Sequence, residues 1–178
     1  MLAILKIMAT TARNPTSAKI YQTRLDLLSE TRNQVVALLN QTLTLTLDLK
    51  SQVKQAHWNV KGMNFYQLHQ LFDAIASQVE EYSDLIAERV TSLGGTAMGT
   101  IRIAAEASTL PEYPFEIIDG KDHVIAIADR LALYGKTVRE AIDQSTDLKD
   151  AGTADLYTEI SRAIDKYLWL LESHLIEN

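Results

Sequence analysis

Residues 64 to 93 carry an apolar stripe with the period of an α-helix. Eight large apolar side chains in this stretch follow one another at steps of three and four residues, which places them on one side of a helix. They are Leu68, Phe72, Ile75, Val79, Tyr82, Ile86, Val90 and Leu93. The Gly94-Gly95 pair then ends the pattern, as glycine often does after a helix. The stretch therefore predicts one long amphipathic helix that must bury this stripe against other helices.

Residues that break secondary structure are scarce in the rest of the chain. Three prolines occur in 178 residues and 47% of the residues are hydrophobic, so long helices can form around a buried core. Apolar steps of three and four predict three further helices, over residues 29–59, 121–145 and 153–175. Ser29 or Thr31 is expected to cap the first of these helices. The predicted fold class is all-α.

Residues 42 to 49 read TLTLTLDL, an alternation that is typical of a strand rather than a helix. Helical patterns flank this segment on both sides, and no turn residue separates it from them. We therefore predict that the helix over residues 29–59 continues through it.

The connection between residues 95 and 119 is long and contains Pro111 and Pro114. About 25 residues can cross the full length of a helix bundle, whereas a tight hairpin between helices does not need them. Residues 101–108 are expected to form a short helix within this connection. Two short turns and one long crossover predict a ferritin-like four-helix bundle with a short extra helix in the crossover.

Charge and cysteine content narrow the functional classes. The formal net charge is −6, and phosphate backbones are bound through Lys and Arg, so the sequence does not favour direct DNA binding. The absence of cysteine excludes disulfides and thiolate metal sites and is compatible with the cytosol. No apolar run approaches the roughly 20 residues of a membrane span. We expect an N-terminal arm over residues 1–28, with no cleaved secretion signal, and one domain over residues 29–176.

Two histidines and three carboxylates recur at helical intervals in the middle of the chain: His57, His69, Asp73, Asp84 and Glu88. His69 and Asp73 are four residues apart, as are Asp84 and Glu88, so each pair lies on one helical face. On a helical wheel with the apolar stripe centred at about 10°, these four residues fall between about 100° and 200°. They therefore do not line the interior of the chain's own bundle.

The axial distance between the two pairs is too large for one metal ion. Asp73 and Asp84 are eleven residues apart in the sequence, which is about 16 Å along a helix axis. Direct ligands lie about 2 Å from a metal ion, so the two pairs cannot share one ion within one chain. Two copies of this helix packed antiparallel across a two-fold axis would bring the halves of the set together. Because a two-fold interface repeats every contact, this arrangement predicts two sites per dimer.

Imidazole and carboxylate ligands without thiolate suit Fe(II), Zn(II) and Mn(II). Carboxylates also stabilise Fe(III), which favours redox chemistry, and a structural zinc site would more often contain cysteine. Each pair taken alone is more often an ordinary surface hydrogen bond or a solvated face. The joint pattern favours iron, and zinc is the alternative occupant.

Three motifs resemble the Dps family, the DNA-binding proteins from starved cells, or mini-ferritins. His57 to Asp73 fit H-W-N-V-x-G-x-x-F-x-x-L-H-x-x-x-D, and Asp84 to Arg89 fit D-x-x-x-E-R. Residues 165–174 fit D-K-x-L-W-x-L-E-S-H. The resemblance covers about residues 29 to 176 and matches all five ligand positions of the family, whereas the E-x-x-H motif of true ferritins is absent.

The resemblance implies a cytoplasmic homo-oligomer, a hollow shell of twelve subunits with di-iron ferroxidase centres at the dimer two-folds. The implied reaction is oxidation of Fe(II), with hydrogen peroxide as the preferred oxidant and ferric oxide stored in the cavity. His57, Asp84 and Glu88 would hold the first iron. His69 and Asp73 would hold, or hydrogen-bond around, the second iron, with Glu88 bridging.

Other positions keep two interpretations each. Trp58, beside a ligand, either donates an electron to quench a radical or packs at the interface. In the family, iron enters the shell through acidic pores on the three-fold axes, and Asp155 matches a residue of these pores. Asp147 and Asp150 are either further pore residues or acids near a helix start that the helix dipole favours. The chain lacks the lysine-rich tail of many DNA-binding members, so direct DNA binding is not favoured, and nucleoid association is kept as an alternative to a purely cytoplasmic location. The alternative function is a DNA-protecting shell with a weak or zinc-occupied metal site.

Overall fold

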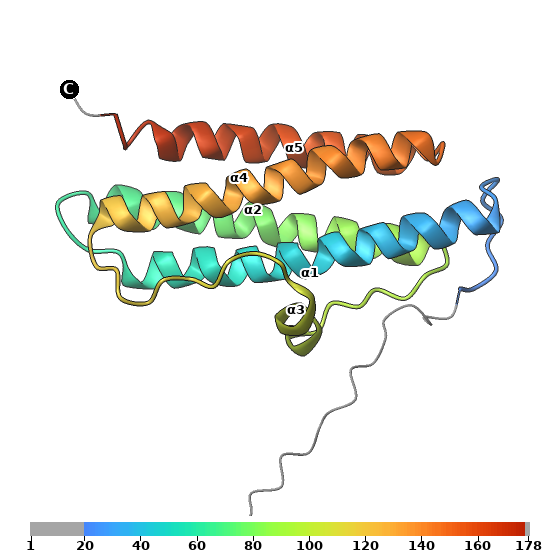
Figure 1. Cartoon of the computed structure of the whole chain (residues 1–178), viewed down its shortest axis with the longest axis horizontal. Coiled ribbons are helices and arrows are strands. Elements are labelled where there is room, and N and C mark those ends of the chain that lie inside the picture. The colour runs from blue at the N-terminus through green and yellow to red at the C-terminus, as the bar shows by residue number, and fades with distance from the viewer. Residues whose placement is uncertain (1–19, 177–178) are drawn as a thin grey trace, which may run out of the picture.

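The computed structural model describes residues 20–176, and within them it contains five helices and no strand (Figure 1). The helices are α1 (Ser29–Asn59), α2 (Phe65–Ser92), α3 (Ile101–Ala107), α4 (Gly120–Asp147) and α5 (Ala151–Glu172). α1 packs along α2 and α4 packs along α5, and the two hairpins form a four-helix bundle. This arrangement confirms the predicted all-α, ferritin-like fold with a short helix in the crossover. Among the described residues, no helix is both long enough and apolar enough to cross a membrane.

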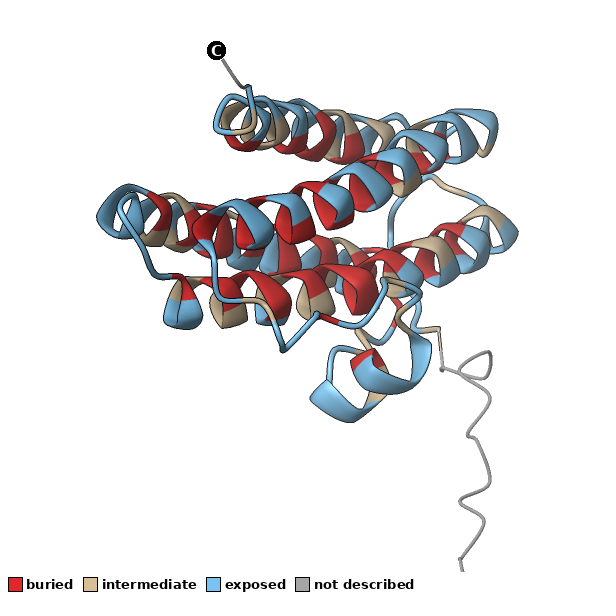
Figure 2. Ribbon diagram, turned by 60° about the vertical axis from the view of Figure 1, so that its left-hand side comes forward, coloured by how far each residue is buried: buried red, intermediate tan, exposed pale blue. Residues whose placement is uncertain are grey.

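The predicted apolar stripe of α2 is its buried face. All eight residues of the stripe are buried, and Figure 2 shows the buried positions of the long helices facing one another inside the bundle. The other helices contribute fully buried residues to the same core, among them Leu39, Leu43 and Leu49 of α1, Ile127 and Leu131 of α4, and Ile160 and Ile164 of α5. Because each such side chain stabilises the fold by roughly 1.5–3 kcal/mol, this core is the main source of stability.

The alternating segment at residues 42–49 is helical and lies inside α1, as predicted. Thr42 and Thr46 are buried there, and each donates its hydroxyl to the backbone carbonyl four residues earlier. Their hydroxyl oxygens also lie 2.9 Å from the Tyr157 hydroxyl and 2.8 Å from the Tyr134 hydroxyl, respectively. Since Thr42 and Thr46 are four residues apart, they share one side of the helix, which faces α4 and α5. Two threonines of the alternating segment thus lie in the core, where tyrosine hydroxyls are their hydrogen-bond partners.

The crossover between α2 and α4 runs along the bundle beside α1, with α3 near its middle (Figure 1). Buried polar side chains fix its second half. Gln52 on α1 donates to the Pro111 carbonyl at 3.0 Å, and buried Arg130 on α4 donates to the Gln52 side chain. The Tyr113 hydroxyl hydrogen-bonds to Nδ1 of His123, which is 1% exposed. The long connection is thus an ordered part of the bundle wall.

The start of α1 differs from the prediction. The residue before its first turn is Leu28, whose side chain makes no capping hydrogen bond, so neither Ser29 nor Thr31 is the N-cap. The hydroxyl of Ser29 instead accepts a hydrogen bond from Nη2 of Arg32 at 3.1 Å. Arg32 also donates to the Leu93 carbonyl at 3.0 Å, so this hydroxyl helps to hold an arginine that ties α1 to the end of α2.

Helices α2 and α4 both end in backbone turns that satisfy the last carbonyls of the helix. After α2, Gly94 adopts a φ of +86° and the Gly95 N–H donates to the Val90 carbonyl at 2.9 Å, which confirms that the glycine pair ends this helix. After α4, Lys149 takes the same role with a φ of +62°. Helix α5 runs from Ala151 to Glu172, so it begins two residues and ends three residues before the predicted limits.

Residues 20–28 of the predicted N-terminal arm precede α1 and are not helical. The Tyr21 N–H donates to the Gly94 carbonyl at 2.7 Å, and Ile20 and Leu27 pack against the core. This part of the arm therefore lies along the bundle. Residues 1–19 lie outside the described residues.

Candidate metal centre

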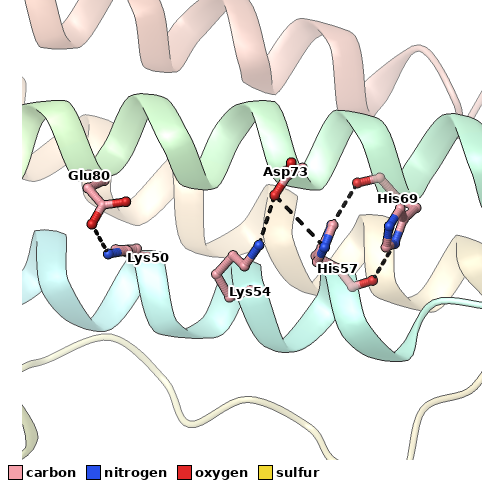
Figure 3. A network of polar contacts seen from close by, with 6 residues as sticks. All are labelled: Lys50, Lys54, His57, His69, Asp73 and Glu80. Atoms are coloured by element: carbon pink, nitrogen blue, oxygen red, sulfur yellow. Dashed lines mark hydrogen bonds and ion pairs between the residues drawn. The ribbon is translucent and has the colours of Figure 1, made fainter.

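The α1–α2 hairpin brings His57 and His69 together. His57 lies at the C-terminal end of α1 and His69 in the second turn of α2, and the short turn between the helices makes these positions adjacent. Their imidazole rings stack with centroids 3.8 Å apart at an interplanar angle of 20° (Figure 3). Phe65 also contacts the His69 ring, with ring centroids 5.1 Å apart and an interplanar angle of 31°. Both rings are therefore held in place by packing.

Reciprocal hydrogen bonds to the backbone fix which nitrogen of each ring is free. Nδ1 of His57 lies 2.9 Å from the carbonyl oxygen of His69, and Nδ1 of His69 lies 2.8 Å from the carbonyl oxygen of His57 (Figure 3). A carbonyl oxygen can only accept, so each Nδ1 carries a proton and donates it. In the neutral rings, each Nε2 then keeps its lone pair and can bind a metal ion.

Asp73 lies one turn beyond His69 on α2 and contacts α1. Its Oδ1 lies 2.8 Å from Nζ of Lys54 and 3.8 Å from Nε2 of His57 (Figure 3). The hydrogen bond from Lys54 is the main reason that the pKa of the Asp73 carboxyl is lowered, and the charges of Lys54 and the two histidines add to the effect. Asp73 is therefore ionised at neutral pH. The sequence prediction missed Lys54, although it lies three residues before His57 and so on the same side of α1.

Asp84 and Glu88 lie further along α2 and are exposed. Neither forms an ion pair with any described residue. No group of three or more histidines and carboxylates that could hold a metal ion occurs within residues 20–176 of the single chain. The five predicted ligands are thus present as two separate parts, His57, His69 and Asp73 in one and Asp84 and Glu88 in the other.

The surface beside the histidines is partly apolar. Trp58 is 67% exposed and lines a groove between α1 and α2, together with Lys54, Asp73 and residues of α3. Exposed Leu85 follows directly after Asp84 on α2. Large apolar side chains that stay exposed next to polar clusters often mark a surface that binds another protein.

The three acidic residues near the start of α5 have different surroundings. Asp147 and Asp155 are exposed, whereas Asp150 is 2% exposed. Asp150 is the N-cap of α5: its Oδ1 accepts the Thr153 N–H at 3.0 Å and Nη2 of Arg89 at 2.6 Å, and its Oδ2 accepts the Thr153 hydroxyl at 2.7 Å. Because both carboxylate oxygens accept hydrogen bonds within the chain, the structure favours the helix-terminal interpretation for Asp150. Arg89 of the D-x-x-x-E-R motif is its ion-pair partner.

Comparison with known proteins agrees with the fold and the motifs. The ferritin-like domain family matches residues 36–177. The chain is 40% identical to a DNA protection during starvation protein of Agrobacterium fabrum, over 89% of this chain and 98% of that protein.

Two solved structures show the same likeness in three dimensions. DpsC from Streptomyces coelicolor has a TM-score of 0.86 and 30% identity, over 95% of this chain and 98% of that one. The tetragonal form of Mycobacterium smegmatis Dps has a TM-score of 0.85 and 28% identity, over 89% and 96%. The family match, the identity and the shared fold together lead to one conclusion: the chain belongs to the Dps family of ferritin-like proteins.

Proposed function

We propose that this protein is a cytoplasmic mini-ferritin that oxidises Fe(II), preferentially with hydrogen peroxide, at di-iron centres between two subunits. The ferric product is stored as an oxide in a hollow shell of twelve subunits. Removal of Fe(II) and peroxide together protects the cell against oxidative damage.

The observation that best supports this proposal is the state of the two histidines. Both rings donate Nδ1–H to a backbone carbonyl and leave Nε2 unprotonated when neutral. A pair of histidines that only stabilised the hairpin would not need an unprotonated Nε2 beside a carboxylate, as His57 has beside Asp73. Nε2 of His57 lies 3.8 Å from Oδ1 of Asp73, which brings a proposed ligand of each iron close together, as a two-metal centre requires.

The second half of each centre comes from the partner subunit in this proposal. Asp84 lies about 16 Å and Glu88 about 22 Å along α2 from Asp73. Both carboxylates are exposed and have no ion-pair partner among residues 20–176. Exposed Trp58 and Leu85 flank the two parts, and burial against a second copy would remove both from water. Antiparallel pairing of two α2 helices would complete two centres at once.

The proposed chemistry balances with two ferrous ions per peroxide. Each Fe(II) gives one electron, the two electrons break the O–O bond, and two hydroxide ions and two Fe(III) result. His57, Asp84 and Glu88 would bind the first iron, and His69 and Asp73 the second, with Glu88 bridging. The carboxylates stabilise the ferric charge. Trp58 would donate an electron to any radical formed beside the site, and Asp147 and Asp155 would line the entry path of iron.

A double variant tests the proposal. His57→Gly with His69→Gly should slow Fe(II) oxidation by peroxide on the order of 10- to 100-fold or more, because loss of a residue that only hydrogen-bonds to a metal ligand already has an effect of that size. His174→Gly is the matched control, because Nδ1 of His174 also bonds to a backbone carbonyl, at 2.8 Å, but lies outside the proposed centre. Gel filtration must show an assembled shell in each case. An unchanged rate in the double variant, or full activity in a monomer, would refute the intersubunit centre.

The alternative is a DNA-protecting shell whose centre is weak or occupied by zinc. The name of the Agrobacterium relative refers to DNA protection, but the net charge of −6 argues against direct contact with DNA in this chain. A gel-shift assay at low and physiological salt, metal analysis of the purified shell and the oxidation assay together separate the two functions.

A further inference from the structure

We propose that Tyr113 and His123 form a redox-active pair, in which an oxidising radical takes one electron from the Tyr113 phenol while the phenol proton passes to Nδ1 of His123. The products are a neutral tyrosyl radical, an imidazolium ion and the anion of the oxidant. The step does not involve the proposed di-iron centre. It adds a second redox site, at the point where the crossover reaches α4.

The pair is enclosed between the end of the crossover and the first turn of α4. Tyr113 is 5% exposed and His123 is 1% exposed. The Tyr113 hydroxyl hydrogen-bonds to Nδ1 of His123, and the two rings lie at an interplanar angle of 23° with centroids 6.1 Å apart. Phe115 packs edge-on against the Tyr113 ring, also with centroids 6.1 Å apart. The phenol and the imidazole are thus held in direct contact.

The direction of this hydrogen bond follows from the available partners. Within residues 20–176, Nδ1 of His123 is the one hydrogen-bond partner of the Tyr113 hydroxyl, and Nε2 of His123 is buried without a partner. If Nδ1 carried the ring proton, the phenol proton and the Nε2 lone pair would both be unpaired. The other tautomer leaves only the Nε2–H unpaired, so the phenol donates and Nδ1 accepts. A base is therefore already in place for the phenol proton.

The protonation states of both groups suit this transfer. Burial raises the pKa of Tyr113 to about 12, so the phenol carries its proton at neutral pH. Burial lowers the pKa of His123, so the imidazole is neutral and can accept a proton, while the charges of Asp119 and Asp122 favour the imidazolium ion that forms. The Arg130 guanidinium lies 5.7 Å from the centre of the Tyr113 ring and disfavours a cationic radical. The electron is therefore expected to leave together with the proton.

Three other tyrosines lack such a base. The hydroxyls of Tyr134 and Tyr157 bond to threonine hydroxyls, and the hydroxyl of Tyr167 bonds to a backbone carbonyl. Neither kind of oxygen takes up a full proton at neutral pH. Tyr157 is buried like Tyr113, so it is the matched control, with the same side chain and no base.

Such a pair would be useful beside the reaction of iron with peroxide. A peroxide that meets a single Fe(II) gains one electron and splits into hydroxide and a hydroxyl radical, and one electron from Tyr113 would convert that radical to hydroxide. Gln52 bonds to Arg130 next to Tyr113. Gln52 precedes His57 by five residues, which is about 7.5 Å along α1. This role, unlike the pair itself, rests on the proposed function.

Pulse radiolysis of the assembled shell with azide radicals, which take single electrons from aromatic side chains, tests the pair without iron. Tyrosyl and tryptophyl radicals are followed by their optical absorption. Tyr113→Phe should lose the long-lived tyrosyl signal of the wild type, and Tyr157→Phe should keep it. His123→Gln should slow the formation of this radical by about 100-fold, because a positioned base contributes at least that much to a proton transfer.

Two results would overturn the inference: a full long-lived tyrosyl signal in Tyr113→Phe, or an unchanged rate in His123→Gln. Should either variant not assemble by gel filtration, the wild type is compared in heavy and in light water. The radical should form more slowly in heavy water because a proton moves with the electron, and equal rates would refute the pair. His57→Gly with His69→Gly should keep the wild-type signal, so failure of the proposed metal centre and failure of the pair are observed separately.

Discussion

The buried threonine–tyrosine pairs predict that loss of the hydrogen-bond acceptor destabilises the fold more than loss of the donor. The Thr42 hydroxyl donates its one proton to a carbonyl of its own helix. The hydrogen bond of 2.9 Å to Tyr157 must therefore be donated by the tyrosine. Burial raises the pKa of Tyr157 far above its ordinary value, so this donor keeps its proton throughout the physiological range. Both side chains are at most 1% exposed, so water cannot replace either partner.

Removal of the acceptor should destabilise the protein more than removal of the donor. Thr42→Val leaves the Tyr157 hydroxyl as a buried donor without a partner, which costs about 1–3 kcal/mol. Tyr157→Phe leaves Thr42 still donating within α1 and loses only the net value of one hydrogen bond, about 0.5–1.5 kcal/mol. The double variant removes both groups, so its loss should be smaller than the sum of the two single losses by about 1 kcal/mol.

Guanidinium unfolding followed by circular dichroism measures this cycle, at one fixed protein concentration because assembly contributes to stability. Thr46→Val with Tyr134→Phe repeats the cycle at the second pair, whose oxygens are 2.8 Å apart. Thr44→Val is the control, since its hydroxyl donates to a carbonyl of α1 and has no other hydrogen-bond partner within residues 20–176. Additive losses at both pairs, to within about 0.3 kcal/mol, would refute the argument that these hydroxyls are coupled.

Three further predictions concern the α4–α5 turn and the crossover. Asp150→Ala removes a helix cap and leaves Arg89 without its ion-pair partner, so the free energy of unfolding should fall by about 3 kcal/mol, whereas exposed Asp147→Ala should change it little in the same denaturant titration. Lys149→Gly should raise the stability by about 1 kcal/mol in thermal unfolding, because glycine adopts the positive φ of +62° without steric strain. Burial lowers the pKa of His123 below its ordinary 6.5, so the unfolded chain binds this proton more readily than the folded chain does. The free energy of unfolding should therefore decrease as the pH falls through 6.5. His123→Gln should lose this part of the pH dependence, which is measured by comparing its stability with that of the wild type at pH 7 and at pH 5.

The fold was predictable because its strongest signals are periodic. The stripe from Leu68 to Leu93 required a long helix, and the length of the connection to α4 required a crossover rather than a hairpin. The start of α1 was not predictable in the same way. Capping rules favour Ser29, but Arg32 uses its hydroxyl, and that contact depends on the approach of the α2 end, sixty residues away. Local propensity was overridden by a tertiary contact.

The division of the candidate ligands into two parts was predictable from the sequence, because it follows from 3.6 residues per turn and a rise of 1.5 Å. The cap formed by Asp150 could not be distinguished from a pore residue, because both are acidic residues near the start of a helix. The tautomers of His57 and His69 depend on two carbonyls across a turn, and no spacing rule predicts them.

The polar contacts of the α1–α2 hairpin also determine the protonation and charge of the proposed ligands before metal binds. The backbone holds the protons of both histidines at Nδ1, so neither ring has to change tautomer on binding. Lys54 neutralises Asp73, so the part of the centre that each chain builds alone has little excess charge and attracts a divalent ion weakly. Asp84 and Glu88 have no ion-pair partner among residues 20–176, and in the proposed centre a second chain would bring histidines to them. On that proposal, tight metal binding is expected to require assembly, and a shell dissociated into monomers should bind Co(II) more weakly than the assembled shell in a calorimetric titration.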